Sequence, residues 1–420
     1  MKKIISLLMA VVLLAIVSCN SDVPVTSMDI NPSAIALQLN STATLTVDFQ
    51  PADATRQSVG WSSNNPSIAS VNNNGVVTAH SVGTAIITAT TNDGRHTATS
   101  LVSVTTLPRR GDVFVGGVKF DGENTQVVLW KNGVAQIFSN RASFDDGISS
   151  VFVSGDNVYM SGVYRGVATL WRNGIPQTLS TQWHSRANSV FVANNNVYVV
   201  GYRFDLVNGN AQNIATLWRN GVQQNLPSGQ EGSFALSVFV SGGNVFVAGY
   251  EFRGDQTIAT LWRNGVRQNL ANNAWATSVH VVGGNVYVAG TVRNTQNVGR
   301  TAVVWRNGTR QNLSTIWAES NSVFVSGGNV FVAGSEVGQF IFGDPLAGVD
   351  HAMIWRNGVR QALTPTAGMR TFASDVFVVG NDVFVVGAER RVARLWRNGV
   401  QQNLQINTPN SIAMSVFVVE

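Results

Sequence analysis

Side chains that could perform acid–base or metal chemistry are sparse in this chain of 420 residues. His184 and His351 have no HxxxH or CxxC companion, and the single cysteine excludes a multi-cysteine zinc site. Two carboxylates roughly 5–10 Å apart would make a glycosidase pair, and seven acidic residues are candidates: Asp145, Asp146, Glu231, Asp255, Glu319, Asp344 and Asp350. The sequence alone does not show whether any two of these carboxylates lie that close to each other. We therefore predict no metal, no cofactor and no identifiable catalytic residue.

Aromatic rings offer a different chemistry, the stacking of a ligand. Six rings in variable segments are the candidate ligand-binding residues: Trp183, Trp275, Trp317, Phe234, Phe340 and Phe342. The three tryptophans stand outside a repeated Trp-x-Asn-Gly motif, and the last two phenylalanines lie in an unusually apolar segment, 335–350. Such rings can stack on sugars or meet an apolar peptide. Alternatively, they plug a channel, cover strand ends or pack against the protein.

The motif Trp-x-Asn-Gly recurs seven times at spacings of 41 to 50 residues, and the mean of about 44 matches four-stranded propeller blades. Each unit contains four strand-like runs, A to D, as in Ser237–Val240, Asn244–Gly249, Ile258–Trp262 and Val266–Leu270. The Asn-Gly between strands C and D suits a type I′ hairpin turn, because both residues accept a positive φ. The motif tryptophans are predicted to be packing anchors between sheets: Trp130, Trp171, Trp218, Trp262, Trp305, Trp355 and Trp396.

The two ends of the repeat region complement each other. The first unit opens at Asp112–Val115 with a strand B that lacks a strand A, and the chain ends at Ser415–Val418 with a strand A that lacks a strand B. Pairing these two strands would remove two open sheet edges. We therefore predict that residues 112–420 form a seven-bladed β-propeller closed by the C-terminal strand. The units resemble kelch-type blades and the bacterial extracellular repeats called HAF.

Loop lengths divide the predicted propeller into two unequal faces. The A–B spacing is constant, whereas the distance from the glycine that ends strand B to the next motif tryptophan varies from 9 to 21 residues. The distance from that tryptophan to the next strand A varies from 17 to 21. In an up-and-down sheet the B–C and D–A connections share one face. Because binding residues favour loops on a rigid scaffold, we expect the ligand on this loop-rich face.

Residues 25–106 are predicted to form a small β-sandwich. Short strand-like runs rich in Thr, Ser and Val alternate with turn clusters at roughly ten-residue spacing. The runs Trp61–Val71, Asn74–Ala79 and Gly83–Ala89 resemble a group 2 bacterial immunoglobulin-like (Ig-like) domain, whose members are stalk and adhesion modules without catalytic residues. Trp61 is expected in the core, and residues 107–111 form a linker.

Residues 1–19 have the composition of an export signal. Two lysines precede an apolar run of 14 residues, which is too short to span a membrane. The run ends at Cys19 and resembles the lipobox of bacterial lipoproteins, which implies lipid attachment there and an extracytoplasmic position, at the outer membrane or cell surface. The alternative is an ordinary secretory signal with an incidental cysteine.

The basic charge of the chain comes from the repeat. The net charge is +5, and one Arg or Lys after each motif tryptophan supplies seven of the 28 basic residues. Without them, 21 basic residues would face 23 acidic ones. A nucleic-acid site requires clustered basic residues with interleaved aromatics, so this periodic pattern argues against nucleic acid as a partner.

The sequence thus predicts an all-β, lipid-anchored binding protein. An Ig-like stalk would present a propeller whose loop-rich face binds a glycan or an extracellular protein, and we expect a monomer. The first alternative is a carbohydrate-active enzyme, a glycoside hydrolase or polysaccharide lyase, with its site on the same face. The second is a structural surface protein without a small ligand.

Overall fold

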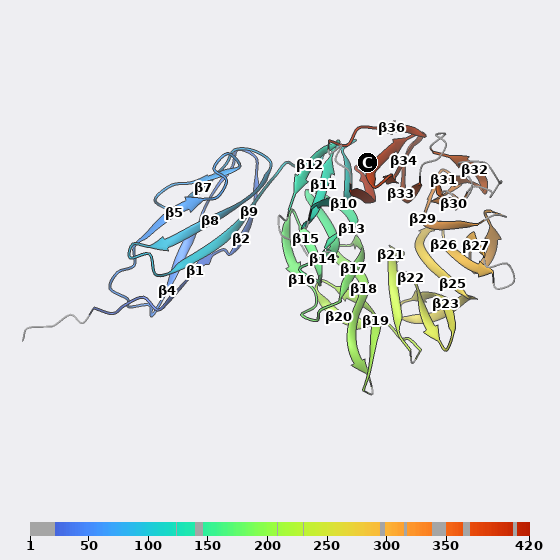
Figure 1. The fold of residues 1–420 in the computed structure, drawn as a ribbon, viewed down its shortest axis with the longest axis horizontal. Helices are drawn as coiled ribbons and strands as arrows, with labels where there is room; N and C mark the ends of the chain where they lie inside the picture. The colour runs from blue at the N-terminus through green and yellow to red at the C-terminus, as the bar shows by residue number, and fades with distance from the viewer. Residues whose placement is uncertain are drawn as a thin grey trace, which may run out of the picture.

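The structure is a computed structural model, and the chain is described over residues 22–122, 124–138, 146–207, 209–229, 231–294, 299–314, 317–337, 350–363, 370–405 and 410–420. Within these ranges all regular secondary structure is β-strand, which confirms the predicted all-β class. Figure 1 shows a slender N-terminal domain (blue) beside a larger array of sheets coloured from turquoise to red. The predicted lipid attachment residue, Cys19, lies outside the described residues.

The N-terminal domain is a sandwich built on one central core. A four-stranded sheet contains β2 (Ala34–Gln38), β9 (Thr97–Thr105), β8 (Gly83–Thr91) and β5 (Val59–Ser63). The other strands are β3 (Thr42–Thr44), β7 (Val76–Ala79) and β6 (Ala69–Val71) in one sheet, and the pair β1 (Ser27–Asn31) and β4 (Thr46–Gln50). Trp61 is partly buried and packs against the core that surrounds Ile87 and Val102.

The rest of the described chain forms seven four-stranded sheets, each in the order A-B-C-D. Sheet 1 contains β37 (Ser411–Val418), β10 (Val113–Asp121), β11 (Asn124–Lys131) and β12 (Val134–Ile137), so its strand A comes from the C-terminus. Sheet 2 contains β13 (Gly147–Ser154), β14 (Asn157–Tyr164), β15 (Val167–Arg172) and β16 (Ile175–Thr178). Sheet 3 contains β17 (Arg186–Ala193), β18 (Asn196–Val207), β19 (Asn210–Arg219) and β20 (Val222–Asn225).

The other four sheets repeat this plan. Sheet 4 contains β21 (Ser233–Ser241), β22 (Asn244–Arg253), β23 (Gln256–Arg263) and β24 (Val266–Asn272), and sheet 5 contains β25 (Ala274–Val282), β26 (Asn285–Asn294), β27 (Gly299–Arg306) and β28 (Thr309–Asn312). Sheet 6 contains β29 (Ala318–Ser326), β30 (Asn329–Val337), β31 (Asp350–Arg356) and β32 (Val359–Ala362). Sheet 7 contains β33 (Thr371–Val379), β34 (Asp382–Glu389), β35 (Val392–Arg397) and β36 (Val400–Gln402).

The repeated tryptophan and the cation after it have distinct structural roles. Each motif tryptophan is at most 1% exposed and belongs to the core of one sheet and its neighbour, which confirms the prediction of a packing anchor. The cation that follows it lies 5.4–5.8 Å from the centre of an aromatic ring on strand B, as with Arg219 over Tyr198. The periodic positive charge is therefore held by cation–π contacts at the rim.

The glycine that ends the core part of each strand B faces a β-bulge in strand A. All seven A strands show a register shift beside it. A Cβ atom on Gly201, for example, would collide with the backbone carbonyl of Arg186 in the bulged strand. This close approach of two backbones is why the repeat requires glycine here.

Two series of contacts link the A strands of neighbouring sheets. The first is a series of rings whose centres lie 4.5–4.9 Å apart, and it returns from the last ring to the first: Phe152, Phe191, Phe239, His280, Phe324, Phe377 and Phe417. In the second, a valine N–H donates to a serine hydroxyl on the preceding sheet, as from Val238 to Ser189 at 3.3 Å and from Val151 to Ser415 at 3.2 Å. β37 pairs with β10 and joins both series.

Asp375 takes the serine position in sheet 7. Its carboxylate accepts hydrogen bonds from Ser322 Oγ at 2.6 Å, Val376 N at 2.9 Å and Val416 N at 3.0 Å. Burial raises the pKa of Asp375 above its usual value of 3.8, although these hydrogen bonds act in the opposite direction. The ionised carboxylate is thus a cost to the fold at neutral pH.

We expect Asp375→Ser to stabilise the protein at pH 7, because it removes a buried carboxylate whose charged form is disfavoured by desolvation. The folded pKa is raised, so the unfolded state loses its proton first and the stability of the wild type falls as pH rises from 3.8. The advantage of the variant should therefore shrink as pH is lowered toward 4, as measured by urea unfolding. The same change at the exposed turn residue Asp156 is the control. An Asp375→Ser variant that is less stable than wild type at pH 7 would contradict this account.

Candidate functional site

The four described candidate rings lie on one face of the sheet array. Trp183 and Trp317 are in D–A connections, and Phe234 and Trp275 are the second residues of β21 and β25, next to such connections. Trp183 is 68% and Trp317 48% exposed, whereas Phe234 and Trp275 are partly buried. Phe340 and Phe342 lie outside the described residues. The face contains the variable connections, and the A–B and C–D turns lie opposite.

The three candidate tryptophans do not contact one another. They belong to the borders of sheets 3, 5 and 6, and within the described ranges no ring contact connects any two of them. The ring of Trp275 is covered by the guanidinium of Arg300, whose central carbon lies 5.8 Å from the ring centre. The three candidate tryptophans thus lie in separate environments, and that of Trp183 borders a cavity.

Trp183 borders a cavity of about 640 Å³ between sheets 2 and 3. The cavity is formed by the β14–β15 turn, the β16–β17 connection and the β18–β19 hairpin. Its lining combines aromatic, hydrogen-bonding and cationic side chains: Val163, Gly166, Trp183, His184, Ser185, Arg186, Tyr202, Phe204 and Asn213. We call it the Trp183 pocket. A pocket with apolar walls and a few convergent polar groups is typical of a small-ligand site.

The β16–β17 connection that carries Trp183 is fixed by hydrogen bonds on both sides. Ser185 Oγ accepts from Ala168 N at 2.9 Å and donates to the carbonyl of Gln182 at 2.7 Å. The N–H of His184, a residue held at φ 61°, donates to the carbonyl of Gly166 at 3.1 Å. The loop is thus locked onto the β14–β15 turn, which presents Trp183 in a prepared orientation.

The β14–β15 turn is itself held by hydrogen bonds to a buried carboxylate. The buried carboxylate of Asp146 accepts the N–H groups of Arg165 at 2.7 Å and Gly166 at 3.0 Å. Gly166 has φ +74°, and a Cβ there would come within 3.0 Å of the indole of Trp183. The glycine therefore permits both the turn and the close packing of the ring over it.

An aromatic cluster extends from the pocket to sheet 4. Tyr202 lines the pocket and meets Phe234 edge-on at 4.8 Å, and Phe234 stacks on Tyr250 at 4.8 Å with the rings inclined by 17°. Phe252 closes the cluster at 5.6 Å from Tyr250, and burial raises the pKa of Tyr250 to about 12. The cluster therefore connects Phe234 to the surroundings of Trp183. Both residues are among the six predicted candidates.

Sequence reasoning missed most of this pocket. Tyr202, Phe204, Tyr250 and Phe252 follow the glycines of two adjacent units as Tyr-x-Phe, at the two-residue period that places both rings on one side of a strand. That repeated pattern was the available signal. No comparable pattern marks Asn213 or Arg186. The β18–β19 hairpin brings Asn213 to the cavity, and Arg186 reaches it from β17 beside the bulge.

Most acidic residues on the loop-rich face are committed to ion pairs or backbone groups. Glu251 pairs with Arg267 at 3.1 Å, Glu336 with Arg360 at 2.8 Å, Glu389 with Arg394 at 2.8 Å, Asp350 with Arg370 at 3.2 Å and Glu319 with Arg300. In the described ranges, no group of three His, Cys, Asp or Glu side chains is placed to hold a metal. Among the described residues that line the Trp183 pocket, none carries a carboxylate.

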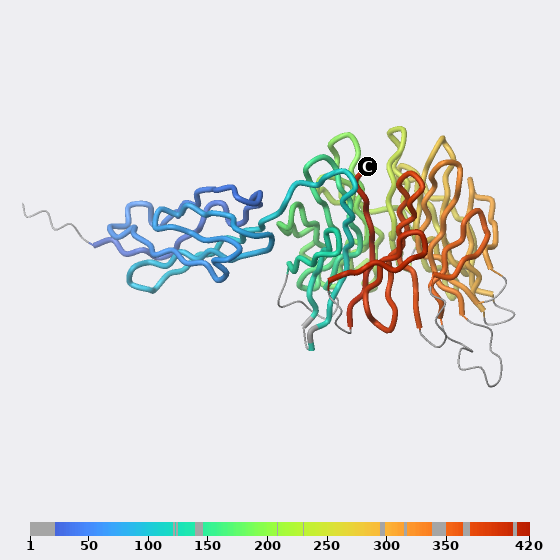
Figure 2. Tube along the Cα trace, turned by 90° about the horizontal axis from the view of Figure 1, so that it is seen from above, coloured from blue at the N-terminus to red at the C-terminus, as the bar shows by residue number. Residues whose placement is uncertain are grey.

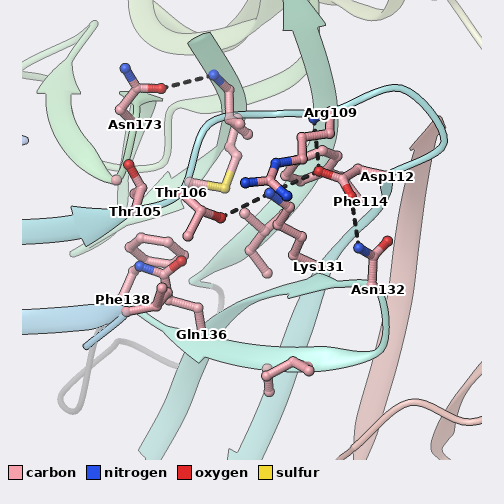
Figure 3. A pocket seen from close by; sticks show the side chains of 17 residues that line it. Thr105, Thr106, Arg109, Asp112, Phe114, Lys131, Asn132, Gln136, Phe138 and Asn173 are labelled. Atoms are coloured by element: carbon pink, nitrogen blue, oxygen red, sulfur yellow. Dashed lines mark hydrogen bonds and ion pairs between the residues drawn. The ribbon is translucent and has the colours of Figure 1, made fainter. Parts of the chain in front are cut away.

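A second cavity, of about 420 Å³, lies where the N-terminal domain meets sheets 1 and 2. Figure 3 shows Lys131 between Asp112, at 2.8 Å, and Thr106 Oγ1, at 2.9 Å, the latter from the N-terminal side of the junction. Burial alone would raise the pKa of Asp112, but hydrogen bonds from Lys131 and Asn132 outweigh it and lower that pKa. The first unit, which has Lys where every other unit has Arg, is thus the one whose cation donates to Thr106 and to the carbonyl of Leu107.

The junction cavity is a version of a crevice that recurs between sheets. A similar space of about 210 Å³ lies between sheets 3 and 4, beside Tyr198, Leu217 and Arg219, the counterparts of Phe114, Leu129 and Lys131. At the junction the N-terminal domain covers the crevice, with Gln136 Nε2 3.4 Å from the carbonyl of Val104. Figure 2 shows this domain extending from the side of the array, next to the turquoise strands. The cavity is a product of domain packing.

Comparison with known proteins identifies the N-terminal domain. A family model described as bacterial Ig-like domain (group 2) matches residues 24–102. Two uncharacterized proteins of Clostridium acetobutylicum are 42% identical over 86 residues and 39% identical over 89 residues. These segments cover 20% and 21% of this chain but only 22% and 9% of the relatives, so the likeness is confined to a domain-sized piece.

Similar solved structures cover more of the chain at low identity. A quinonprotein alcohol dehydrogenase-like protein from Bacteroides thetaiotaomicron has a TM-score of 0.44 at 10% identity, covering 93% of this chain and 97% of that one. An auxiliary nutrient binding protein from Bacteroides ovatus has a TM-score of 0.34 at 11% identity, covering 93% and 90%. An exo-1,5-alpha-L-arabinanase from a bovine ruminal metagenomic library has a TM-score of 0.30 at 10% identity, covering 51% and 96%.

The described residues contain no helix that could serve as a membrane span. The prediction of an Ig-like domain from the spacing of Trp61 and the turns that follow it is confirmed by the family match. The chain therefore carries a group 2 bacterial Ig-like domain at its N-terminus, followed by an all-β region whose described residues form seven four-stranded sheets.

Proposed function

We propose that this protein is an extracytoplasmic, lipid-anchored binding protein that captures a glycan in the Trp183 pocket. The observation that carries the proposal is the exposure of the Trp183 indole, 68%, at the mouth of a cavity that also offers Tyr202, Phe204 and Asn213. A flat apolar ring that remains in water, on a connection whose neighbouring residues are held by hydrogen bonds, is suited to stack on the apolar face of a sugar. Asn213 and His184 supply donors and acceptors for sugar hydroxyls.

In this proposal the seven sheets are the blades of a propeller closed by β37. Both the ring series and the serine series support it, because each passes through β37 and returns to its starting sheet. A closed wheel gives the loop-rich face a rigid frame. The Ig-like domain would hold the propeller away from a membrane, in which a lipid attached to Cys19 would anchor the chain.

The carbohydrate-active enzyme is the less favoured alternative. A retaining or inverting glycosidase needs two available carboxylates facing the scissile bond. The Trp183 pocket is lined by none, and Glu251, Glu319 and Glu336 elsewhere on the face are held in ion pairs. A binding role requires only the aromatic and polar groups that line the pocket.

We expect Trp183→Ala to weaken glycan binding by at least tenfold, because the stacking platform is removed, while the melting temperature changes little. One tenfold step corresponds to about 1.4 kcal/mol. The measurement is a glycan array on the full-length protein, followed by calorimetry on each oligosaccharide that binds. Trp317→Ala is the matched control, since Trp317 is also exposed on this face but lies outside the pocket.

Three outcomes would contradict the proposal. Equal binding by wild type and the Trp183→Ala variant would place the site elsewhere. New reducing or unsaturated ends on the oligosaccharides would indicate a hydrolase or lyase. Absence of binding to every glycan, with capture of an extracellular protein instead, would replace the glycan by a protein ligand.

A further inference from the structure

We propose that the Trp183 pocket selects acidic glycans, whose sugar rings carry carboxylate groups; this inference rests on the proposed glycan-binding function. In the part of the lining that the structure describes, Arg186 stands with three aromatic residues and no acidic one. The pocket therefore combines a stacking surface with an uncompensated positive charge, and this pair of features matches a sugar that has an apolar face and a carboxylate.

Arg186 has no acidic partner among the described residues, as is also true of Arg165, Arg293, Arg390 and Arg391 on this face. Of these five arginines, Arg186 is the one that lines the Trp183 pocket. Other arginines of the face are held in ion pairs, namely Arg203, Arg253, Arg267, Arg300, Arg360, Arg370 and Arg394. The guanidinium of Arg186 makes one weak polar contact, from Nη2 to Ser149 Oγ at 3.4 Å. Four of its five N–H donors are thus available to a ligand.

The backbone of Arg186 fixes where this charge lies. Arg186 is the first residue of β17 and pairs with Tyr202 of β18, so the cation and the ring are directly opposite each other. Its carbonyl packs against Gly201, the residue that admits the bulge. The side chain is partly buried, which leaves the guanidinium less screened by water than a fully exposed one.

The nearby acidic groups neither neutralise Arg186 nor repel an anion at close range. The carboxylate of Asp146 is engaged by the N–H groups of Arg165 and Gly166. That of Asp205 is engaged by Arg203 and by the N–H of Leu206. A second cation, Arg165, lies beside Gly166 with its guanidinium carbon 5.1 Å from the ring centre of Tyr164.

The chemistry favours a carboxylated sugar over a neutral one. A guanidinium only donates, and it binds a carboxylate through two parallel hydrogen bonds that are stronger than those to neutral hydroxyls. The hydroxyl groups of a neutral sugar need acceptors as well as donors. Of the two hydroxyl-bearing residues in the lining, Ser185 and Tyr202, the first is already used in both directions by Ala168 and Gln182. The acid therefore gains more from this pocket than its neutral counterpart does.

The test compares uronate oligosaccharides with their carboxyl-reduced forms, which keep the same rings without the charge. Calorimetry on the full-length protein is expected to show at least tenfold tighter binding of the acidic member of a pair, with an affinity that falls as salt is raised. Arg186→Gln should reduce that preference to less than threefold while the neutral form binds as before. Arg186→Lys should restore part of it, because the charge returns without the bidentate geometry.

The matched control is Arg219→Gln, which removes the same charge from an exposed site on the opposite, tightly turned side. It should leave the preference unchanged. Equal binding of acidic and neutral forms by wild type, or a preference that survives in Arg186→Gln, would overturn this inference but not the proposed function. Failure of every acidic and neutral glycan to bind would overturn the proposed function itself.

Discussion

A chain that lacks residues 411–420 is expected to lose the cooperative unfolding transition of its seven-sheet region. β37 supplies strand A of sheet 1, and it pairs with β10 from Val113 to Lys119. Its removal would expose the edge of β10 and leave the ring of Phe152 without Phe417 on one side. It would also remove Ser415, the acceptor for Val151 N. An open sheet edge of this kind promotes aggregation.

The measurement is thermal and urea unfolding together with light scattering. Deletion of Glu420 alone is the matched control, since the pairs of β37 end at Val418 and should survive it. Addition of a peptide of residues 411–420 to the truncated chain should restore part of the transition. A truncated protein that unfolds as cooperatively as the intact one would refute closure by the C-terminal strand.

Acidification from pH 7 to pH 4 is expected to destabilise the protein through His280. This residue is 9% exposed on β25, and its ring lies 4.6 Å from that of Phe239 and 4.5 Å from that of Phe324. Burial lowers the pKa of His280 from 6.5 to about 4. The unfolded state therefore takes up a proton first, and stability is lost as pH falls from 6.5 toward 4, by about 2–3 kcal/mol in all.

Replacement of His280 by Phe, the residue found at this position in the other six sheets, should remove this contribution. The difference in unfolding free energy between variant and wild type, measured by urea titration, should grow as pH falls from 7 to 4. His184→Asn, which removes an exposed imidazole from the Trp183 pocket, serves as the control and should show no such growth. A constant difference between His280→Phe and wild type across this range would contradict the prediction.

The repeat allowed much of the fold to be predicted because its signals are local. The turn Asn-Gly, the period-two alternation and the terminal strand A each depend on a few neighbouring residues, and the structure has the expected four-stranded sheets, with β37 beside β10. The glycine that ends the core part of strand B was visible as a repeated residue. The reason that glycine is required there became apparent only in the structure. The bulge in the paired strand A brings its backbone too close to Gly201 for a Cβ atom to fit.

The candidate site was predicted less completely. The loop-rich face, Trp183 and Phe234 followed from loop length and composition, and the structure places both near Tyr202. Trp275, another candidate, lies on β25 of sheet 5, and the guanidinium of Arg300 covers its ring. Which rings converge depends on the order of sheets around the array and on side chains from several connections, and none of this is encoded in local spacing.

The sequence by itself determined the strands, the seven units, the Ig-like domain and the side on which loops vary, because each follows from the periodicity of short segments. The tertiary structure alone decided which residues share a cavity, since Trp183, Arg186, Tyr202 and Asn213 come from three connections that meet only when sheets 2 and 3 pack. It also decided that Arg186 has no acidic partner among the described residues, whereas the nearby Arg203 pairs with Asp205. Ion pairing depends on distances across strands, and those distances exist only in the folded chain.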